Sequence, residues 1–222
     1  MLKLRPLQDR LEQIYGIDTC QDVDDFLITD RHLARALEGR EHARDVDELL
    51  LVREQNDELG VSLFLDADLV GRLVADDPEH SLHDGNLADF CTALEGVSHF
   101  VHLVWRARES RSTSRLELEL QAEVDKFVSS INLLGRQGLG AVPPTLHHRL
   151  FQQVRFDETL DDSERNRYET ANRYAARYCH HLEVRFLRPF NAGPRAISDE
   201  LRDFYRLNLR EKIARIERAP AM

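Results

Sequence analysis

The clearest pattern of hydrophobic and polar positions lies in mid-chain, from Ser114 to Gly135. Apolar residues recur there at alternating steps of four and three, which places them on one face of an α-helix. They are Leu116, Leu120, Val124, Phe127, Ile131 and Leu134. Ser114 and Glu117 have the spacing of a capping box, and Gly135 stands where a left-handed residue can end a helix. We therefore predict a central helix over 114–135 that is buried by the rest of the chain.

Two short apolar runs that precede this helix are typical of a β-hairpin. They are Glu48–Glu54 and Leu59–Leu65, and four polar residues separate them. Phe26–Thr29 is a third, weaker β-favouring run. Val97–Trp105 fits a helix by its spacing, but it is also rich in β-branched and aromatic residues. We predict a strand there, because a lone hairpin is only marginally stable in water.

Helical spacing and capping residues recur along the rest of the chain. In the first half, helices are expected over Leu4–Ile14, closed by Gly16, after the capping residues Asp30 and Asp66, and from Asn86 onward. In the second half, they are expected over Leu146–Val154, over Tyr168–Leu182 and from Ser198 to Ile216.

These elements together predict an α+β fold. A small antiparallel sheet, consisting of the hairpin and one or two further strands, packs on the central helix in the N-terminal half, and the C-terminal half is all helical. We expect an α+β lobe over residues 1–142 and a helical lobe over residues 143–222, packed together as one domain.

Composition narrows the class of protein. The chain of 222 residues is 42% hydrophobic and 32% charged, which is ordinary for a folded globular protein that needs no cofactor for stability. A net charge of −10 argues against a general nucleic-acid binder. The charge is uneven: residues 1–143 carry 15 basic and 28 acidic side chains, net −13, while residues 144–222 carry 15 and 12, net +3. Such an asymmetry suits binding between proteins.

The chain shows no secretory signal and no apolar run of about 18 residues, so we expect a cytoplasmic protein. The three cysteines, Cys20, Cys91 and Cys179, are widely spaced and are expected to be reduced. Arginine outnumbers lysine 27 to 3, which suggests a GC-rich bacterial genome.

Ten histidines suggest a metal site, but their spacing does not support one. His99 and His102 could meet one ion on a helix, whereas on the predicted strand they point to opposite faces. The adjacent pairs His147–His148 and His180–His181 diverge on a helix, and no zinc-finger spacing is present. The His83–Asp84 step fits a turn, and Asp66 and Asp68 fit a helix start. We therefore predict no metal and no cofactor.

One spacing resembles a known catalytic motif. Arg173 is followed by six residues and then His180, which resembles the arginine-to-histidine motif of HEPN-type ribonucleases. The resemblance covers eight residues and departs from the pattern at Tyr174, where a polar residue usually follows the arginine. It implies that Arg173, with Arg177 nearby, stabilises charge on a phosphate while His180 transfers a proton.

The stiff loop from Arg188 to Arg195 contains two prolines and a glycine. Arg188 and Arg195, together with His181, are candidate residues for binding an anionic ligand or a partner's carboxylate. Without a strong catalytic signature, the favoured hypothesis is a non-catalytic cytosolic accessory protein that binds another protein or forms a homodimer. The alternative is a phosphate-directed hydrolase, such as an HEPN-like ribonuclease, that uses Arg173 and His180.

Overall fold

The computed structural model describes residues 3–39, 45–55, 58–138, 143, 145–154, 159–187 and 194–218. The first half contains α1 (Arg5–Tyr15), a 3-10 turn (Val23–Phe26), β1 (Leu27–Ile28), α2 (Arg31–Glu38), β2 (Glu48–Gln55), β3 (Glu58–Leu65), α3 (Ala67–Ala75), α4 (Leu87–Arg108) and α5 (Arg115–Arg136). The second half contains α6 (Leu146–Phe151), α7 (Asp162–Leu182), a π-helical turn (Glu183–Leu187), α8 (Pro194–Arg206) and α9 (Leu209–Arg218). The α+β fold class is confirmed.

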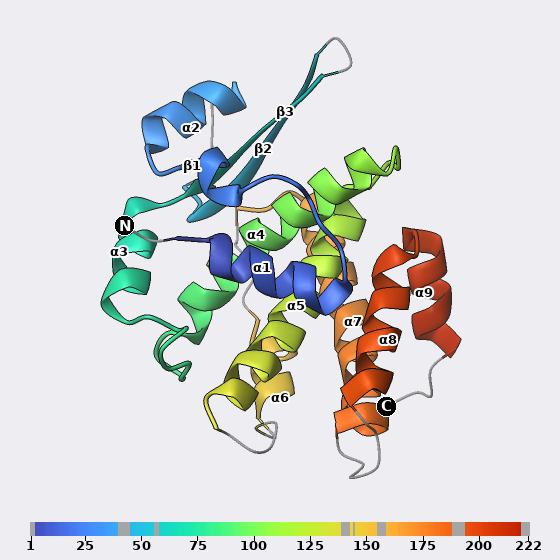
Figure 1. Cartoon of the computed structure of the whole chain (residues 1–222). Coiled ribbons are helices and arrows are strands. Elements are labelled where there is room, and N and C mark those ends of the chain that lie inside the picture. Colours follow the sequence, from blue (N-terminus) through green and yellow to red (C-terminus); the bar gives the residue numbers. More distant parts are fainter. Residues whose placement is uncertain are drawn as a thin grey trace.

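The sheet has three strands in the order β1-β3-β2 (Figure 1). β2 and β3 form the expected antiparallel hairpin, with Glu48 opposite Leu65 and Gln55 opposite Glu58. The third strand is β1, which pairs with β3 in parallel, so the sheet is mixed rather than purely antiparallel. The far end of the hairpin projects beyond the helices, whereas α2 lies beside its other end, near Leu49 and Phe64 (Figure 1).

The prediction of a strand over Val97–Trp105 is wrong, because this segment lies within the 22-residue helix α4. Phe90, Leu94, Val97, Phe100 and Val101 are all buried, so the helical spacing of these residues matches their burial. The β-branched and aromatic side chains are frequent here because α4 is covered on several sides. Tertiary packing has overridden local β-propensity.

Helix α5 is the central helix, as predicted, and packs between α4 and α7. Leu120, Val124 and Phe127 are fully buried. The Ser114 hydroxyl accepts a hydrogen bond from the Glu117 amide at 3.2 Å, which confirms the N-terminal cap. The helix does not end through a left-handed Gly135: it continues to Arg136, and the left-handed glycine is Gly138, with φ of 89°.

The C-terminal segment departs from the prediction in one respect. The single helix expected after Ser198 is two helices, α8 and α9, separated at Leu207 and Asn208, and Ser198 lies inside α8. Asn208 caps α9 instead: its side chain accepts from the Glu211 amide, and the Glu211 carboxylate accepts from the Asn208 amide.

The helices of both halves share one hydrophobic core, which runs from Leu4, just before α1, to Ile216 on α9. Tyr15 of α1 stacks on Tyr205 of α8, with ring centroids 4.0 Å apart. None of the described helices is long and apolar enough to span a membrane.

Candidate functional site

A cluster of charged side chains is buried where β2, α4, α5 and α7 meet. We call Glu48, Glu95, His99, Glu119 and Arg167 the His99 cluster. The two nitrogens of the His99 ring face different carboxylates: Nδ1 lies 3.8 Å from Oε1 of Glu48, and Nε2 lies 3.4 Å from Oε2 of Glu119. The Arg167 Nε lies 3.5 Å from the other Glu119 oxygen.

Helix geometry and one glycine bring these groups together. Glu95 and His99 are four residues apart on α4 and therefore share a face. Glu48 is the first residue of β2, and its side chain lies against Gly96 of α4. A β-carbon at position 96 would lie 2.9 Å from Cγ of Glu48 and 2.6 Å from Cδ1 of Leu63. The missing side chain at Gly96 thus lets the strand and the helix approach closely.

Lys126 of α5 supports the cluster from one side. Its Nζ lies 2.6 Å from Oε2 of Glu95 and 2.7 Å from Oε1 of Glu123. Counting these neighbours, four carboxylates face two basic side chains, Lys126 and Arg167. The cluster is therefore short of positive charge unless His99 is protonated or a cation binds.

The pKa values of several groups in and beside the cluster are shifted. Burial raises the pKa of Glu48 and of Glu123. Burial alone would lower the pKa of His99, but the carboxylates of Glu119 and Glu48 outweigh it, so the pKa lies well above its usual range. Oε1 of Glu48, Nε2 of His99 and Nε of Arg167 are buried atoms with no hydrogen-bond partner. These atoms lie in ion pairs of 3.4 to 3.8 Å, which are too long or too poorly aligned to be hydrogen bonds.

A second buried polar network lies on the other side of α4 and α5; we call it the Lys212 network. Nζ of Lys212 donates to Oε1 of Gln121 at 2.8 Å and lies 3.8 Å from Glu117. Gln121 in turn donates to Asp125 at 2.8 Å, and Asp125 also accepts from Ser98 at 2.6 Å. This network joins α9 to α4 and α5.

Its members titrate abnormally because they are buried. Burial lowers the pKa of Lys212 to about 7 and that of His102 to about 3. Burial also raises the pKa of Asp125 to about 6. For Glu117, His102, Lys212 and Arg106 outweigh burial and lower the pKa to about 2. Lys212 and Asp125 therefore change charge closer to neutrality than exposed lysine and aspartate side chains do.

His99 and His102 lie on the same helix, yet they belong to different sites. His99 faces Glu48 and Glu119, whereas Nε2 of His102 lies 3.4 Å from Glu117 in the Lys212 network. On a helix these two imidazoles could have met one ion. In the structure the neighbours of His99 are carboxylates instead.

The residues of the HEPN-like motif lie along α7. Arg173 is exposed, and Arg177 donates to the backbone carbonyl of Glu217 at 2.9 Å. His180 is half-buried, and its ring lies edge-on to that of His147, 5.9 Å away. Their contacts thus involve different neighbours, α9 in one case and α6 in the other. The ribonuclease hypothesis stays a prediction.

The three candidate binding residues lie on and between α7 and α8. Arg188 lies outside the described residues, and Arg195 is exposed in the first turn of α8. His181 is half-buried, near the Phe186 ring at 6.4 Å, and burial lowers its pKa. Their role in binding stays a prediction.

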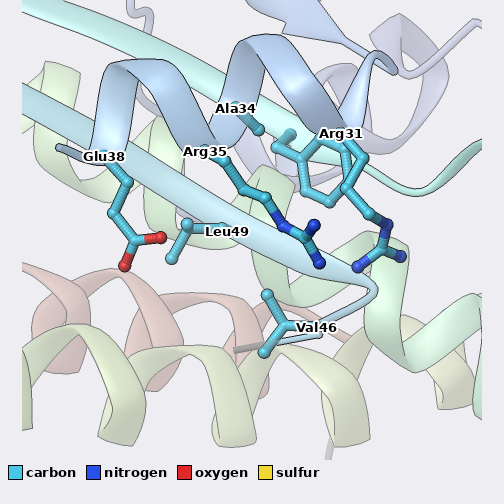
Figure 2. Close-up of a pocket in the computed structure, with 7 residues that line it drawn as sticks. Arg31, Ala34, Arg35, Glu38, Val46 and Leu49 are labelled. Atoms are coloured by element: carbon cyan, nitrogen blue, oxygen red, sulfur yellow. The ribbon is translucent and has the colours of Figure 1, made fainter. Parts of the chain in front are cut away.

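Helix α2 (Arg31–Glu38) and strand β2 (Glu48–Gln55), which we call the α2–β2 unit, present a partly apolar surface. A shallow pocket lies between α2 and the sheet, and Arg31, Ala34, Arg35, Glu38, Val46 and Leu49 line it together with Phe64 (Figure 2). Three of the six exposed large apolar side chains of the described residues belong to this unit: Leu33, Leu37 and Val52.

The acidic members of the His99 cluster were missed by the sequence argument, although two signals were present. Glu95 and His99, like Glu119 and Glu123, are four residues apart on helices. The chain has only three lysines, and two of them, Lys126 and Lys212, are in these buried clusters.

No family model, no curated protein and no solved structure matches the chain.

Proposed function

We propose that this chain is an accessory protein that binds a protein partner through the α2–β2 unit. The observation that carries the proposal is the open edge of β2 beside exposed apolar side chains. The partner segment that fits this surface is extended, and it adds a strand to the outer edge of β2.

The edge supports this proposal because β2 is the outer strand of the sheet order β1-β3-β2 in the described part of the chain. An outer strand offers a row of backbone N–H and C=O groups to another chain. From Val52 to Gln55 the side chains of β2 are exposed. This end of the hairpin stands clear of the helices (Figure 1).

The apolar side chains support it independently. Leu33 and Leu37 are 45% and 52% exposed, and they are four residues apart on α2. Val52 on β2 is 47% exposed. Leu49 faces α2, so Val52 belongs to the opposite face of the sheet from Leu33 and Leu37. Exposed apolar side chains on both sides of an outer strand are typical of an interaction surface.

The test compares two substitutions that are chemically identical. Val52→Glu places a charge at the proposed surface, and Val184→Glu places one on a valine of the same 47% exposure on the π-helical turn. The tagged parent and both variants are used to isolate bound proteins from the source cell, and their masses in solution are measured by analytical ultracentrifugation. Both variants should fold, because charges at exposed positions cost little stability.

We expect V52E to lose a partner that the parent and V184E retain. If the parent is a dimer that V52E disrupts and V184E preserves, the partner is a second copy of the chain. If V52E keeps every partner and the oligomeric state of the parent, the α2–β2 unit is not the binding surface.

A further inference from the structure

Glu48, Glu95 and His99 converge inside the His99 cluster in a way that suits a metal ion. One carboxylate oxygen or ring nitrogen from each residue lies within 4.8 Å of the other two. Nδ1 of His99 and Oε1 of Glu48 are 3.8 Å apart. Atoms that share a metal ion are roughly 3 to 3.5 Å apart, since each lies about 2 Å from the ion. Only small side-chain movements separate this arrangement from a coordination sphere.

Burial and hydrogen bonding also make these side chains suitable for binding a cation. His99 is 8% exposed, and Oε1 of Glu48 is buried with no hydrogen-bond partner. His99 lies 3.8 Å from this oxygen, which is too far for a hydrogen bond, so the lost hydration is only partly offset. A cation between Glu48, Glu95 and Nδ1 of His99 would supply the partner.

The three side chains have neighbours of the kind that orient metal ligands in proteins. A histidine that binds a metal through one nitrogen usually directs its other nitrogen at a carboxylate. Glu119 takes this place, 3.4 Å from Nε2 of His99, and Arg167 lies 3.5 Å from Glu119. Lys126 holds Glu95 through its Nζ at 2.6 Å.

We propose that Glu48, Glu95 and His99 bind one divalent cation, with Glu119 positioning the His99 ring. One imidazole and two carboxylates suit Mn²⁺, Fe²⁺ or Zn²⁺ better than Ca²⁺ or Mg²⁺, which prefer oxygen ligands alone. Three protein ligands leave coordination positions for water, as in sites where the metal takes part in chemistry. This site is separate from the α2–β2 surface, so it goes beyond the partner-binding role.

The test uses the full chain after treatment with EDTA and titrates it with Mn²⁺ alone. Binding is followed by isothermal calorimetry and by loss of the electron paramagnetic resonance signal of free Mn²⁺. We expect one ion per chain. Glu48→Gln, Glu95→Gln and His99→Ala each remove one ligand, while Glu119→Gln leaves all three ligands and removes only the outer partner.

We expect E119Q to weaken binding by roughly 10- to 100-fold, and each ligand variant to weaken it further. The matched control is His83→Ala, because His83 also lies beside a carboxylate, Asp76 at 3.2 Å, but both are exposed. H83A should bind Mn²⁺ as the parent does. Circular dichroism checks that each variant is folded. If H99A does not fold, E48Q still tests the site, because glutamine has nearly the shape of glutamate.

The proposal is wrong if the parent binds no Mn²⁺ at millimolar concentration. It is also wrong if folded E48Q and E95Q bind as tightly as the parent, or if H83A is weakened as much as they are. V52E should bind Mn²⁺ normally, so the metal site and the partner surface are tested separately.

Discussion

A buried lysine belongs to the Lys212 network and another supports the His99 cluster, in a chain whose basic residues are mostly arginine. Only 3 of the 30 basic residues are lysines, and two of them, Lys126 and Lys212, are largely or fully buried. A lysine amine is compact and can approach several acceptors at once, whereas the planar guanidinium needs a wider site. Lys126 reaches Glu95 and Glu123 in this way. The residue type therefore fits the tight space between the helices.

Gly96→Ala tests the close approach of strand and helix. The added β-carbon would meet Leu63 at 2.6 Å and Glu48 at 2.9 Å, so the packing must shift. We expect G96A to lower the free energy of unfolding by about 1–3 kcal/mol, since overpacking outweighs the better helix propensity of alanine. Urea unfolding measures the change.

The control for this substitution is Gly71→Ala on α3, where nothing lies within 4 Å of the added carbon. G71A should raise stability by up to about 1 kcal/mol through helix propensity alone. Equal effects of the two substitutions would show that the contact at Gly96 does not constrain the fold.

At the residue scale, helix caps and left-handed glycines could be predicted from the sequence, but the partners of buried polar residues could not. Asp30 and Asp66 cap their helices and Gly16 is left-handed, as predicted, because each feature depends on a few neighbouring residues. Glu48 and Glu95 are 47 residues apart in sequence and lie on different elements, so no local rule joins them. Their cluster depends on how the sheet packs against α4.

At the scale of elements, the misassigned segment Val97–Trp105 shows what propensity cannot resolve. Its spacing and its composition gave opposite answers, and the structure follows the spacing. β-propensity largely reflects how well a side chain fits a half-buried surface. A helix buried on several sides, such as α4, offers its β-branched and aromatic residues similar burial. The hairpin was readable because two matched apolar runs flank a polar turn.

Helix α9 is anchored in the protein by a buried charge, which makes its stability depend on pH. Burial lowers the pKa of Lys212 to about 7 from 10.5, so the unfolded chain binds more protons than the folded chain between these values. The free energy of unfolding therefore rises with pH across this range. We expect Lys212→Met to remove this rise, so that the parent gains about 2 kcal/mol relative to K212M between about pH 7.5 and 9.5.

The measurement is urea unfolding of both proteins at the two pH values. Lys3→Met is the control, because it removes an exposed lysine and should leave the slope unchanged. If K212M and the parent change equally with pH, Lys212 is charged in the folded protein throughout this range.

At the scale of the whole molecule, the predicted lobes share a core. Ala171, Ala175 and Leu182 of α7 are buried, and α7 packs along α5 from the first lobe. Arg206 of α8 donates to the carbonyls of Tyr15 and Gly16 at 3.0 and 3.1 Å. The predicted boundary near residue 142 thus divides the sequence between elements that contact each other.

Residues 1–142 should not fold alone, because removal of α7 and α8 exposes the apolar faces of α5 and α1. We expect the full chain to unfold in one cooperative transition, and the fragment to keep helical circular dichroism without a cooperative melt. Calorimetry of both proteins measures this. Two separate transitions in the full chain, or a cooperative transition in the fragment, would show that the lobes are independent domains.

The central chemical claim is that carboxylates from β2 and α4 meet His99 to form a metal site. Anomalous diffraction from a crystal soaked in MnCl₂ tests it most directly. The account predicts one strong peak between Glu48, Glu95 and Nδ1 of His99. A map with no peak at that position would contradict the claim, whether or not Mn²⁺ binds elsewhere.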